Sequence, residues 1–236
     1  MLVLPQAASS RGLGPEPAQD PPALADLQAQ VDASVEPSLK LSLLVKLAQR
    51  TSQVDVARSR QLADEALALA RELGDPAAEA EAQAAHGIAW TRAGDMDKAL
   101  EAYELALDMA RSSGDAACLG RAMQRMGSAH AARGENERAI RYCEEAASLL
   151  GDRASERELA FLHNTHGMAL RAVEDVSGAL EHMSLALEYC QRSHSDDLAA
   201  SLQYHLGILQ ETAGETDRAA VYYLQAAEAN QRLGSE

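Results

Sequence analysis

The chain has 236 residues, of which 36 are acidic and 21 are basic, so its formal net charge at pH 7 is −15. Hydrophobic residues make up 47% of the sequence but aromatic residues only 3%, so alanine and leucine carry most of the apolar content. β-Sandwiches and barrels fill their pleated surfaces with β-branched and aromatic side chains, so this composition argues against them and favours an all-α fold. The negative charge argues against non-specific binding of nucleic acid, whose phosphates it repels.

The N-terminal residues contain most of the prolines of the chain. Residues 1–22 combine Pro, Gly, Ser and Gln without apolar periodicity, which predicts a disordered tail. The apolar residues that come next share helical spacing: Leu24, Leu27, Val31 and Val35. We therefore expect a short amphipathic helix over residues 23–36, ending before Pro37.

Fixed-period self-similarity dominates the remainder of the sequence. Three sets of small residues recur at a spacing of 40: Gly87, Gly127, Gly167 and Gly207; Ala99, Ala139, Ala179 and Ala219; Ala106, Ala146, Ala186 and Ala226. A turn lies between the first two sets in each copy, and a fifth, divergent copy precedes them. Such a period predicts stacked helical hairpins. We expect a solenoid over residues 37–236, with hairpins over 38–75, 76–115, 116–154, 155–196 and 197–236.

Each hairpin is expected to pack through its small residues. A glycine in the first helix removes a Cβ where the second helix crosses closely, the facing alanines do the same from the other side, and larger residues flank the contact. Three positions depart from the pattern. His130 and Gln210 stand where Trp90 stands in the first complete repeat, and Glu174 replaces the turn glycine of the third. Looser packing and lower local stability are predicted there.

The first complete repeat carries a family resemblance. The positions that carry it are Gly87, Trp90, Gly94, Asp95, Ala99, Tyr103 and Ala106. This pattern resembles the tetratricopeptide repeat family over residues 38–236, which implies an all-α, right-handed superhelical solenoid of antiparallel helix pairs. The period of 40 exceeds the family's common ~34 residues, so the second helix of each pair is expected to be about a turn and a half longer. Similar lengthened repeats occur in spindle-orientation adaptors and in sensory regions of bacterial signalling proteins.

Histidines offer the nearest approach to a metal site. His163 and His166 lie three residues apart on one helix face, a spacing that can chelate a metal. In repeat register, however, they replace two methionines of the preceding repeat, so we expect them to pack in the core. His182, Cys190 and His194 could share a stripe on another helix, but an incidental thiol beside histidines at a helix end is the simpler interpretation. We expect no metal site.

Catalytic and cofactor-binding patterns are weak. The Gly-Leu-Gly of residues 12–14 has no strand before it and no helix after it, unlike a phosphate-binding loop. The carboxylate pairs Glu144–Glu145 and Glu156–Glu158 suit solvated helix faces better than acid–base chemistry. No nucleophile can be placed beside a base. The sequence therefore predicts a protein that is not an enzyme and carries no cofactor.

Location and redox state follow from the apolar runs and the cysteines. The N-terminal run Met1–Leu4 stops at Pro5, too early for a signal peptide, and no apolar run has membrane-spanning length. Cys118, Cys143 and Cys190 are too widely spaced to indicate a disulfide framework or a zinc knuckle. We expect a cytoplasmic protein that does not bind membranes.

Stacked hairpins place their first helices on a concave face, where a partner can bind. The residues predicted to face this groove are Arg92, Arg121, Gln124, Arg125, Phe161, Asn164, Met168, Arg171, Tyr204, His205 and Ile208. Their arginines suit a peptide that bears carboxylates. Two alternatives stay open: the arginines pair with local glutamates, or some of these residues only pack between neighbouring hairpins.

Two known binding modes of the family are not matched. The chaperone-tail clamp uses lysines and asparagines where this chain has other residues, and the asparagine ladder of spindle-orientation adaptors falls on Ala85, Arg125, Thr165 and His205. The resemblance thus implies a non-catalytic module that binds a protein or peptide, within a bacterial signalling or regulatory protein. A receptor that switches conformation on binding a small peptide or other ligand is the alternative.

The last helix, expected over 216–233, is apolar on two sides. One side carries Ala219, Tyr223 and Ala226, and the other carries Val221, Leu224 and Ala227. A terminal helix needs a polar outer face or a cover. We therefore expect either that the chain is part of a longer protein or that this helix forms a homodimer.

Overall fold

The computed structural model describes residues 21–234, and every regular element within that range is a helix. The elements are α1 (Pro21–Ala33), α2 (Pro37–Thr51), α3 (Val56–Leu73), α4 (Pro76–Ala93), α5 (Met96–Ser113), α6 (Ala116–Ala132), α7 (Asn136–Leu150), η1 (Gly151–Arg153), α8 (Glu156–Ala172), α9 (Val176–Ser193), α10 (Asp196–Thr212) and α11 (Thr216–Leu233). The predicted tail and the Gly-Leu-Gly of residues 12–14 lie outside this range, apart from Pro21 and Pro22, which begin α1. None of these helices combines the length and hydropathy needed to cross a bilayer.

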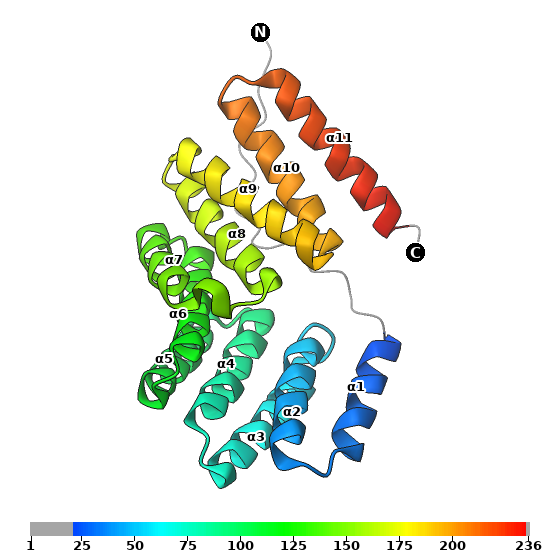
Figure 1. The fold of residues 1–236 in the computed structure, drawn as a ribbon, viewed down its shortest axis with the longest axis vertical. Helices are drawn as coiled ribbons and strands as arrows, with labels where there is room; N and C mark the ends of the chain where they lie inside the picture. Colours follow the sequence, from blue (N-terminus) through cyan, green and yellow to red (C-terminus); the bar gives the residue numbers. More distant parts are fainter. Residues whose placement is uncertain (1–20, 235–236) are drawn as a thin grey trace.

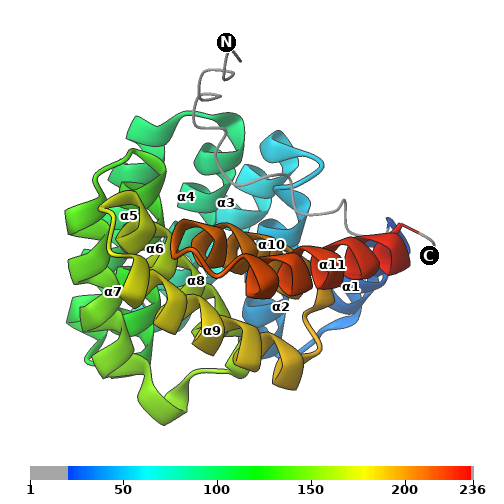
Figure 2. The ribbon, with the colours of Figure 1, turned by 90° about the horizontal axis from the view of Figure 1, so that it is seen from above.

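The helices stack as consecutive antiparallel pairs along a curved path, shown in Figures 1 and 2. The pairs α2–α3, α4–α5, α6–α7, α8–α9 and α10–α11 each pack closely, and the first helices also contact one another, α2 with α4, α4 with α6 and α6 with α8. Among the described residues, the second helices of neighbouring pairs make no comparable contact. An inner layer of first helices and an outer layer of second helices is the arrangement that gives a solenoid a concave face. The predicted all-α solenoid is confirmed.

The turns follow a rhythm of 20 residues. The helix N-caps from α3 onward lie at Asp55, Asp75, Asp95, Asp115, Glu135, Ser155, Asp175, Ser195 and Glu215. Most of these side chains accept backbone N–H groups of the first helical turn, which otherwise lack partners. Asp75 Oδ1, for example, accepts from Ala77 and Ala78 at 3.1 and 3.0 Å. The caps divide each repeat equally, so α4 and α5 both have 18 residues. The expectation of a longer second helix was wrong.

The first helix begins and ends earlier than the predicted range 23–36. Leu27 and Val31 are buried, but Val35 lies beyond the end of α1 and is 94% exposed. The reason is the cap of the next helix, because the carboxylate of Glu36 accepts the N–H groups of Ser38 and Leu39. That cap requires extended backbone at Glu36, so the helix cannot continue through it.

Within each hairpin, the first-helix glycine meets a large side chain of the second helix. A Cβ on Gly87 would overlap the ring of Tyr103, and one on Gly167 would lie 2.7 Å from Met183 Cγ. The pairs Gly127–Cys143 and Gly207–Tyr223 have the same arrangement. The expectation that glycine faces alanine holds in part, because the carbonyls of Ala139 and Ala179 lie 3.4 and 3.3 Å from a Cβ built at Gly127 and Gly167. The nearest atoms, however, belong to a larger second-helix side chain, which fills the space that the missing Cβ leaves.

The packing around His130 is not loose, contrary to expectation. The side chain is 6% exposed, and its ring stacks on Tyr142 with the ring centroids 5.3 Å apart. His130 Nδ1 lies 3.0 Å from Glu135 Oε2. Stacking and a hydrogen bond to the turn thus hold the imidazole, although a hollow of about 230 Å³ lies beside it, lined by Met126 and Tyr142 among others. The lower local stability at Gln210 and Glu174 remains a prediction.

Two residues other than glycine occupy the left-handed turn position. Glu174 has φ 66°, where the equivalent Gly94, Gly134 and Gly214 have φ between 77° and 83°. His194 has φ 52°, where the equivalent Gly74 and Gly114 have φ 64° and 72°. A side chain with a Cβ is strained in this region. The third complete repeat therefore has a turn that its neighbours form without strain.

We expect Glu174→Gly to raise the free energy of unfolding by about 1 kcal/mol. Glycine removes the strain of the left-handed backbone, which stabilises the fold, and it also makes the unfolded chain more flexible, which destabilises the fold by a smaller amount. Urea denaturation measures this. Glu174→Ala is the control, because it removes the same carboxylate and keeps the strain. Equal stabilisation by both substitutions would show that the charge, not the backbone, is responsible.

Candidate functional site

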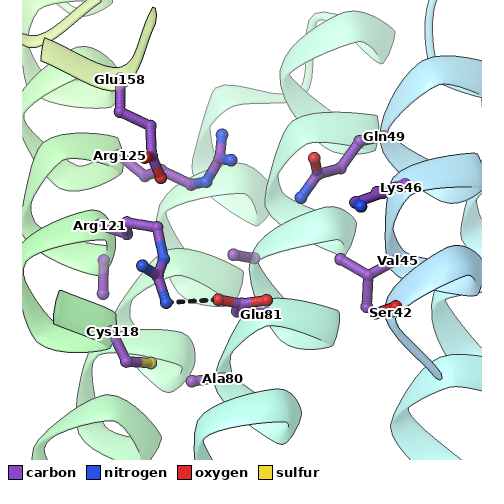
Figure 3. Close-up of a pocket in the computed structure, with 12 residues that line it drawn as sticks. Ser42, Val45, Lys46, Gln49, Ala80, Glu81, Cys118, Arg121, Arg125 and Glu158 are labelled. Atoms are coloured by element: carbon purple, nitrogen blue, oxygen red, sulfur yellow. Dashed lines mark hydrogen bonds and ion pairs between the residues drawn. The ribbon is translucent and has the colours of Figure 1, made fainter. Parts of the chain in front are cut away.

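The concave face contains a hollow of about 360 Å³ between α2, α4 and α6 (Figure 3). Its charged and amide-bearing walls come from Lys46 and Gln49 of α2, Glu81 of α4, and Arg121 and Arg125 of α6. Small side chains of α4 and α6, including alanines, complete the lining. Three consecutive first helices thus contribute to one surface, which agrees with the predicted position of a groove but not with its predicted extent.

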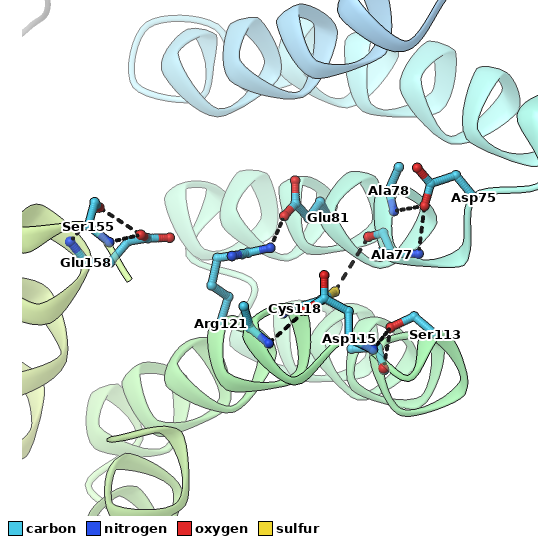
Figure 4. Close-up of polar contacts among 12 residues, drawn as sticks. Asp75, Ala77, Ala78, Glu81, Ser113, Asp115, Cys118, Arg121, Ser155 and Glu158 are labelled. Atoms are coloured by element: carbon cyan, nitrogen blue, oxygen red, sulfur yellow. Dashed lines mark hydrogen bonds and ion pairs between the residues drawn. The ribbon is translucent and has the colours of Figure 1, made fainter. Parts of the chain in front are cut away.

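An ion pair crosses the hollow between equivalent positions of two repeats. Arg121 Nη2 lies 2.6 Å from Glu81 Oε1, and their side chains are 29% and 42% exposed (Figure 4). Arg121 Nε is buried, with no hydrogen-bond partner among the described residues. The guanidinium therefore uses only part of its five-donor capacity. The predicted alternative of local pairing holds for this arginine, although its partner is on the neighbouring first helix.

The other two cations of the hollow have no carboxylate partner within residues 21–234. Neither Lys46 nor Arg125 forms an ion pair there. Glu158 also lines the hollow, but its Oε2 accepts the backbone N–H and the hydroxyl of Ser155 at 2.8 and 2.7 Å in the capping box of α8 (Figure 4). The hollow thus has more positive charge than the local carboxylates neutralise.

The cysteine at the edge of the hollow is an unreactive thiol. Cys118 is 2% exposed, and its Sγ donates to the Ala77 carbonyl at 3.6 Å (Figure 4). Burial raises the pKa of Cys118 to about 11. The pKa values of Cys143 and Cys190 are also raised by burial, to about 12 and about 11. A protonated thiol is a poor nucleophile and a poor metal ligand.

Some predicted groove residues instead connect neighbouring hairpins. Gln124 Nε2 donates to the Glu158 carbonyl at 2.9 Å, and Asn164, one repeat later at the same register, is only 9% exposed. The predicted alternative of packing between hairpins therefore describes Gln124, and Asn164 is too buried to present a binding surface. In the last repeat the same register holds Tyr204, which is 53% exposed because no first helix follows α10 among the described residues.

The other predicted groove residues lie outside the hollow. Arg92 is exposed, and five others are partly buried along the later first helices: Phe161, Met168, Arg171, His205 and Ile208. Burial lowers the pKa of His205, and the positive charge of Arg171 adds to this effect. The structure thus brings Arg121 and Arg125 into one surface with Glu81, while the apolar residues lie toward the C-terminal end of the solenoid.

Sequence reasoning missed the contribution of α2. Four residues of this helix line the hollow at the spacing of a single helix face: Ser42, Val45, Lys46 and Gln49. The spacing was visible in the sequence. The divergent first repeat lacks the glycine that defines the register elsewhere, so nothing aligned these residues with Glu81 and Arg121.

Three histidines form a second cluster, between α8 and α9. His163 Nδ1 lies 2.9 Å from His182 Nδ1, and the rings of His166 and His182 stack with centroids 3.9 Å apart. The ring of Tyr189 also stacks on His163, with the ring centroids 5.7 Å apart. The expectation of core packing at His163 and His166 did not foresee His182. Stacked rings do not direct their nitrogens to one point, and no group of metal ligands occurs within residues 21–234.

These histidines favour the neutral form. Burial lowers the pKa of His163 and of His166 from 6.5 to about 4, and the positive charge of a protonated neighbour adds to the effect. Burial also lowers the pKa of His182. Three nearby carboxylates partly oppose this last shift: Glu181, Glu144 and Asp175. The direct bond between His163 and His182 requires one donor nitrogen and one acceptor nitrogen, so the two Nδ1 atoms cannot both be protonated.

Comparison with known proteins confirms the repeat and the fold. Residues 122–157, from α6 through α7 into α8, match the family model of the tetratricopeptide repeat. Similar solved structures include BtubC (BKLC) from P. vanneervenii, with 23% identity and a TM-score of 0.69 over 90% of this chain and 91% of that chain. No curated protein matches the sequence.

Two further bacterial structures share the fold. MamA, from residue 41 to its end, from Desulfovibrio magneticus RS-1 has 22% identity and a TM-score of 0.52 over 80% of this chain and 96% of that chain. Aspartyl phosphate phosphatase F from Bacillus subtilis has 11% identity and a TM-score of 0.59 over 88% of this chain and 64% of that chain. At these identities the likeness concerns the fold alone.

The histidine cluster predicts that acid destabilises the protein. Unfolded histidines bind protons below pH 6.5, whereas His163 and His166 in the fold resist protonation until about pH 4, so stability is full above pH 6.5 and is lost as the pH falls toward 4. The two shifts together correspond to at most about 4 kcal/mol between pH 7 and pH 5. Because solvent partly screens these half-buried rings, we expect urea denaturation to give a free energy of unfolding about 2 kcal/mol lower at pH 5 than at pH 7.

A double variant tests the assignment to this cluster. Replacing His163 and His166 with methionine, which the preceding repeat has at both equivalent positions, should remove most of the loss between pH 7 and pH 5. The exposed His194, changed to asparagine to preserve its left-handed backbone, is the control and should leave the loss intact. The same pH dependence in all three proteins would contradict the assignment.

Proposed function

We propose that the chain is a non-catalytic protein-interaction module that binds a peptide or protein segment along its concave face. The observation that carries this proposal is the hollow between α2, α4 and α6, in which Lys46 and Arg125 have no carboxylate partner among the described residues. An extended segment offers carboxylates and backbone carbonyls, which such donors bind. The inner layer of first helices continues this surface toward α10.

The chemistry of the concave face suits binding better than catalysis. The cysteine of the hollow, Cys118, is a buried thiol whose pKa burial raises to about 11, and Arg121 is already paired with Glu81. The remaining groups are permanent cations and amides, which position a partner but do not transfer protons near neutral pH. These features support a module that is not an enzyme and needs no cofactor.

Within this proposal, the module belongs to a bacterial signalling or regulatory protein and works in the cytoplasm. The lengthened repeats support the signalling role through the family resemblance, and bacterial MamA and the Bacillus phosphatase have the same fold. Three free, buried cysteines support the cytoplasmic location, because a reducing compartment keeps such thiols unpaired.

A receptor for a small peptide or other ligand is the second candidate. The volume of the hollow, about 360 Å³, lies within the range of about 300–1,000 Å³ that is usual for small-molecule sites. Such a receptor would change the pitch of the solenoid on binding, because neighbouring first helices form both walls. Small-angle scattering distinguishes the two candidates, since a peptide laid along a rigid surface leaves the solenoid's dimensions unchanged.

A homodimer through α11 is a separate part of the proposal. Val221 and Leu224 are 55% and 60% exposed on this helix. The equivalent positions of earlier repeats are polar: Glu101, Arg141 and Glu181 for the first, and Glu104, Glu144 and Ser184 for the second. Exposed apolar residues where the other repeats have polar ones favour a contact, and a second copy of α11 offers a matching surface.

Substitutions on the concave face test the binding proposal. We expect Phe161→Ala and Tyr204→Ala each to lower recovery of a partner from the source lysate by about tenfold, as loss of an aromatic anchor does. Quantitative mass spectrometry of the bound fraction measures this. Leu105→Ala is the control, because Leu105 is a similarly exposed apolar residue on α5, a second helix. Equal recovery with all three variants would contradict a groove at these residues.

A charge introduced on α11 tests the dimer. We expect the unmodified protein to have twice the monomer mass by light scattering, and the double variant Val221→Glu, Leu224→Glu to have the monomer mass, because facing carboxylates repel. Leu105→Glu adds charge elsewhere and should keep the dimer. A monomer mass for the unmodified protein at micromolar concentration would refute this contact.

A further inference from the structure

We propose that the hollow binds one carboxylate-bearing side chain of the partner segment and that Glu81 is a built-in competitor for this ligand. The inference rests on the proposed function and specifies its chemistry. In the unbound protein, Arg121 is held by Glu81 at 2.6 Å. A ligand carboxylate would take this place on Arg121 and would gain Arg125 and Lys46, which have no carboxylate partner in the described residues.

The charge of the hollow is opposite to that of the molecule. The chain has a net charge of −15, yet Lys46, Arg121 and Arg125 converge on a space where only Glu81 and Glu158 are acidic. Glu158 is occupied by both donors of Ser155 in its capping box. Three cations thus face two carboxylates, and only Glu81 is ion-paired with one of the cations, which leaves an excess of one positive charge in the hollow.

The donors of Arg121 indicate the kind of anion. A guanidinium offers five N–H donors in a planar fork that matches a carboxylate in a bidentate manner. Only Nη2 is used toward Glu81, while the buried Nε has no partner among the described residues. The group that Arg121 already holds is a carboxylate. A carboxylate is therefore the ligand chemistry that the geometry of Arg121 favours.

Glu81 is placed to compete without blocking. Its side chain is 42% exposed, and an ion pair as open to water as this one contributes only about 0–1 kcal/mol. The ligand can therefore displace it at low cost. When it is displaced, the Glu81 carboxylate stays beside the ligand and repels it, so Glu81 lowers affinity both as a competitor and as a neighbour.

The test uses an end-blocked peptide with an uncharged fluorescent label and a single glutamate among alanines and glutamines. Its neutral counterpart has glutamine in place of that glutamate. We expect fluorescence anisotropy to show binding of the first peptide only. Arg125→Gln should weaken this binding about tenfold, the effect of losing one charge-assisted hydrogen bond. Glu81→Gln should strengthen it about threefold or more, because it removes the competitor.

Matched variants separate this site from general electrostatics. Arg141→Gln on α7 and Glu101→Gln on α5 make the same two changes of charge at exposed positions of second helices. Both should leave the peptide affinity unchanged. Equal strengthening by Glu81→Gln and Glu101→Gln, or no loss with Arg125→Gln, would overturn the proposal. Arg125→Gln should stay folded, because Arg125 has no ion-pair partner to lose among the described residues. Thermal denaturation of the variant checks this.

Failure of this inference is distinguishable from failure of the interaction proposal. If the Phe161 and Tyr204 variants lose a captured partner while the acidic peptide does not respond to Arg125 and Glu81, the module binds partners and the carboxylate site is wrong. If the peptide responds as expected and no variant changes partner recovery, the site is supported and the wider groove is wrong.

Discussion

The two-residue turn between helices is the constraint on which the solenoid depends. A residue in the left-handed region ends one helix, and the next residue caps the following helix, every 20 residues from Gly74 to Gly214 except before Ser155. Each residue added to a helix would rotate everything after it by about 100°. Helices of nearly constant length therefore present the same face in every repeat. This is why Glu81 and Arg121, 40 residues apart, meet across the concave surface.

A strained turn and a cluster of partly buried histidines lie together in one hairpin. The pair α8–α9 contains both the strained turn at Glu174 and the neutral histidine cluster of His163, His166 and His182. In a solenoid each hairpin is stabilised by its own packing and by that of its neighbours. Acid should therefore open this hairpin before the N-terminal repeats. The hollow is lined mostly by α2, α4 and α6, but Glu158 of α8 also lines it. Conditions that loosen α8 should therefore change this one wall and leave the walls from α2 and α4 in place.

The sequence predicted what repetition encodes and missed what depends on contacts between particular side chains. Glycines and alanines at a fixed period gave the hairpins and the concave face, because their spacing survives any change of rotamer. His182 was missed because its partners lie on the neighbouring helix, and only side-chain orientation brings them together. Lys46 was missed because its repeat lacks the marker glycine. The error over helix length arose from assigning all the additional residues to one helix, when the caps share them equally.

A cationic hollow in an acidic molecule also limits the partner. Each carboxylate that enters the hollow gains Arg125 and Lys46 at short range, but every further acidic residue of the partner meets the field of a chain with a net charge of −15. At physiological salt this repulsion acts over about 8 Å, which is less than the length of even a short extended peptide. The best-suited segment therefore carries an isolated carboxylate between neutral or basic residues. A uniformly acidic tail would match the hollow and still be repelled by its surroundings.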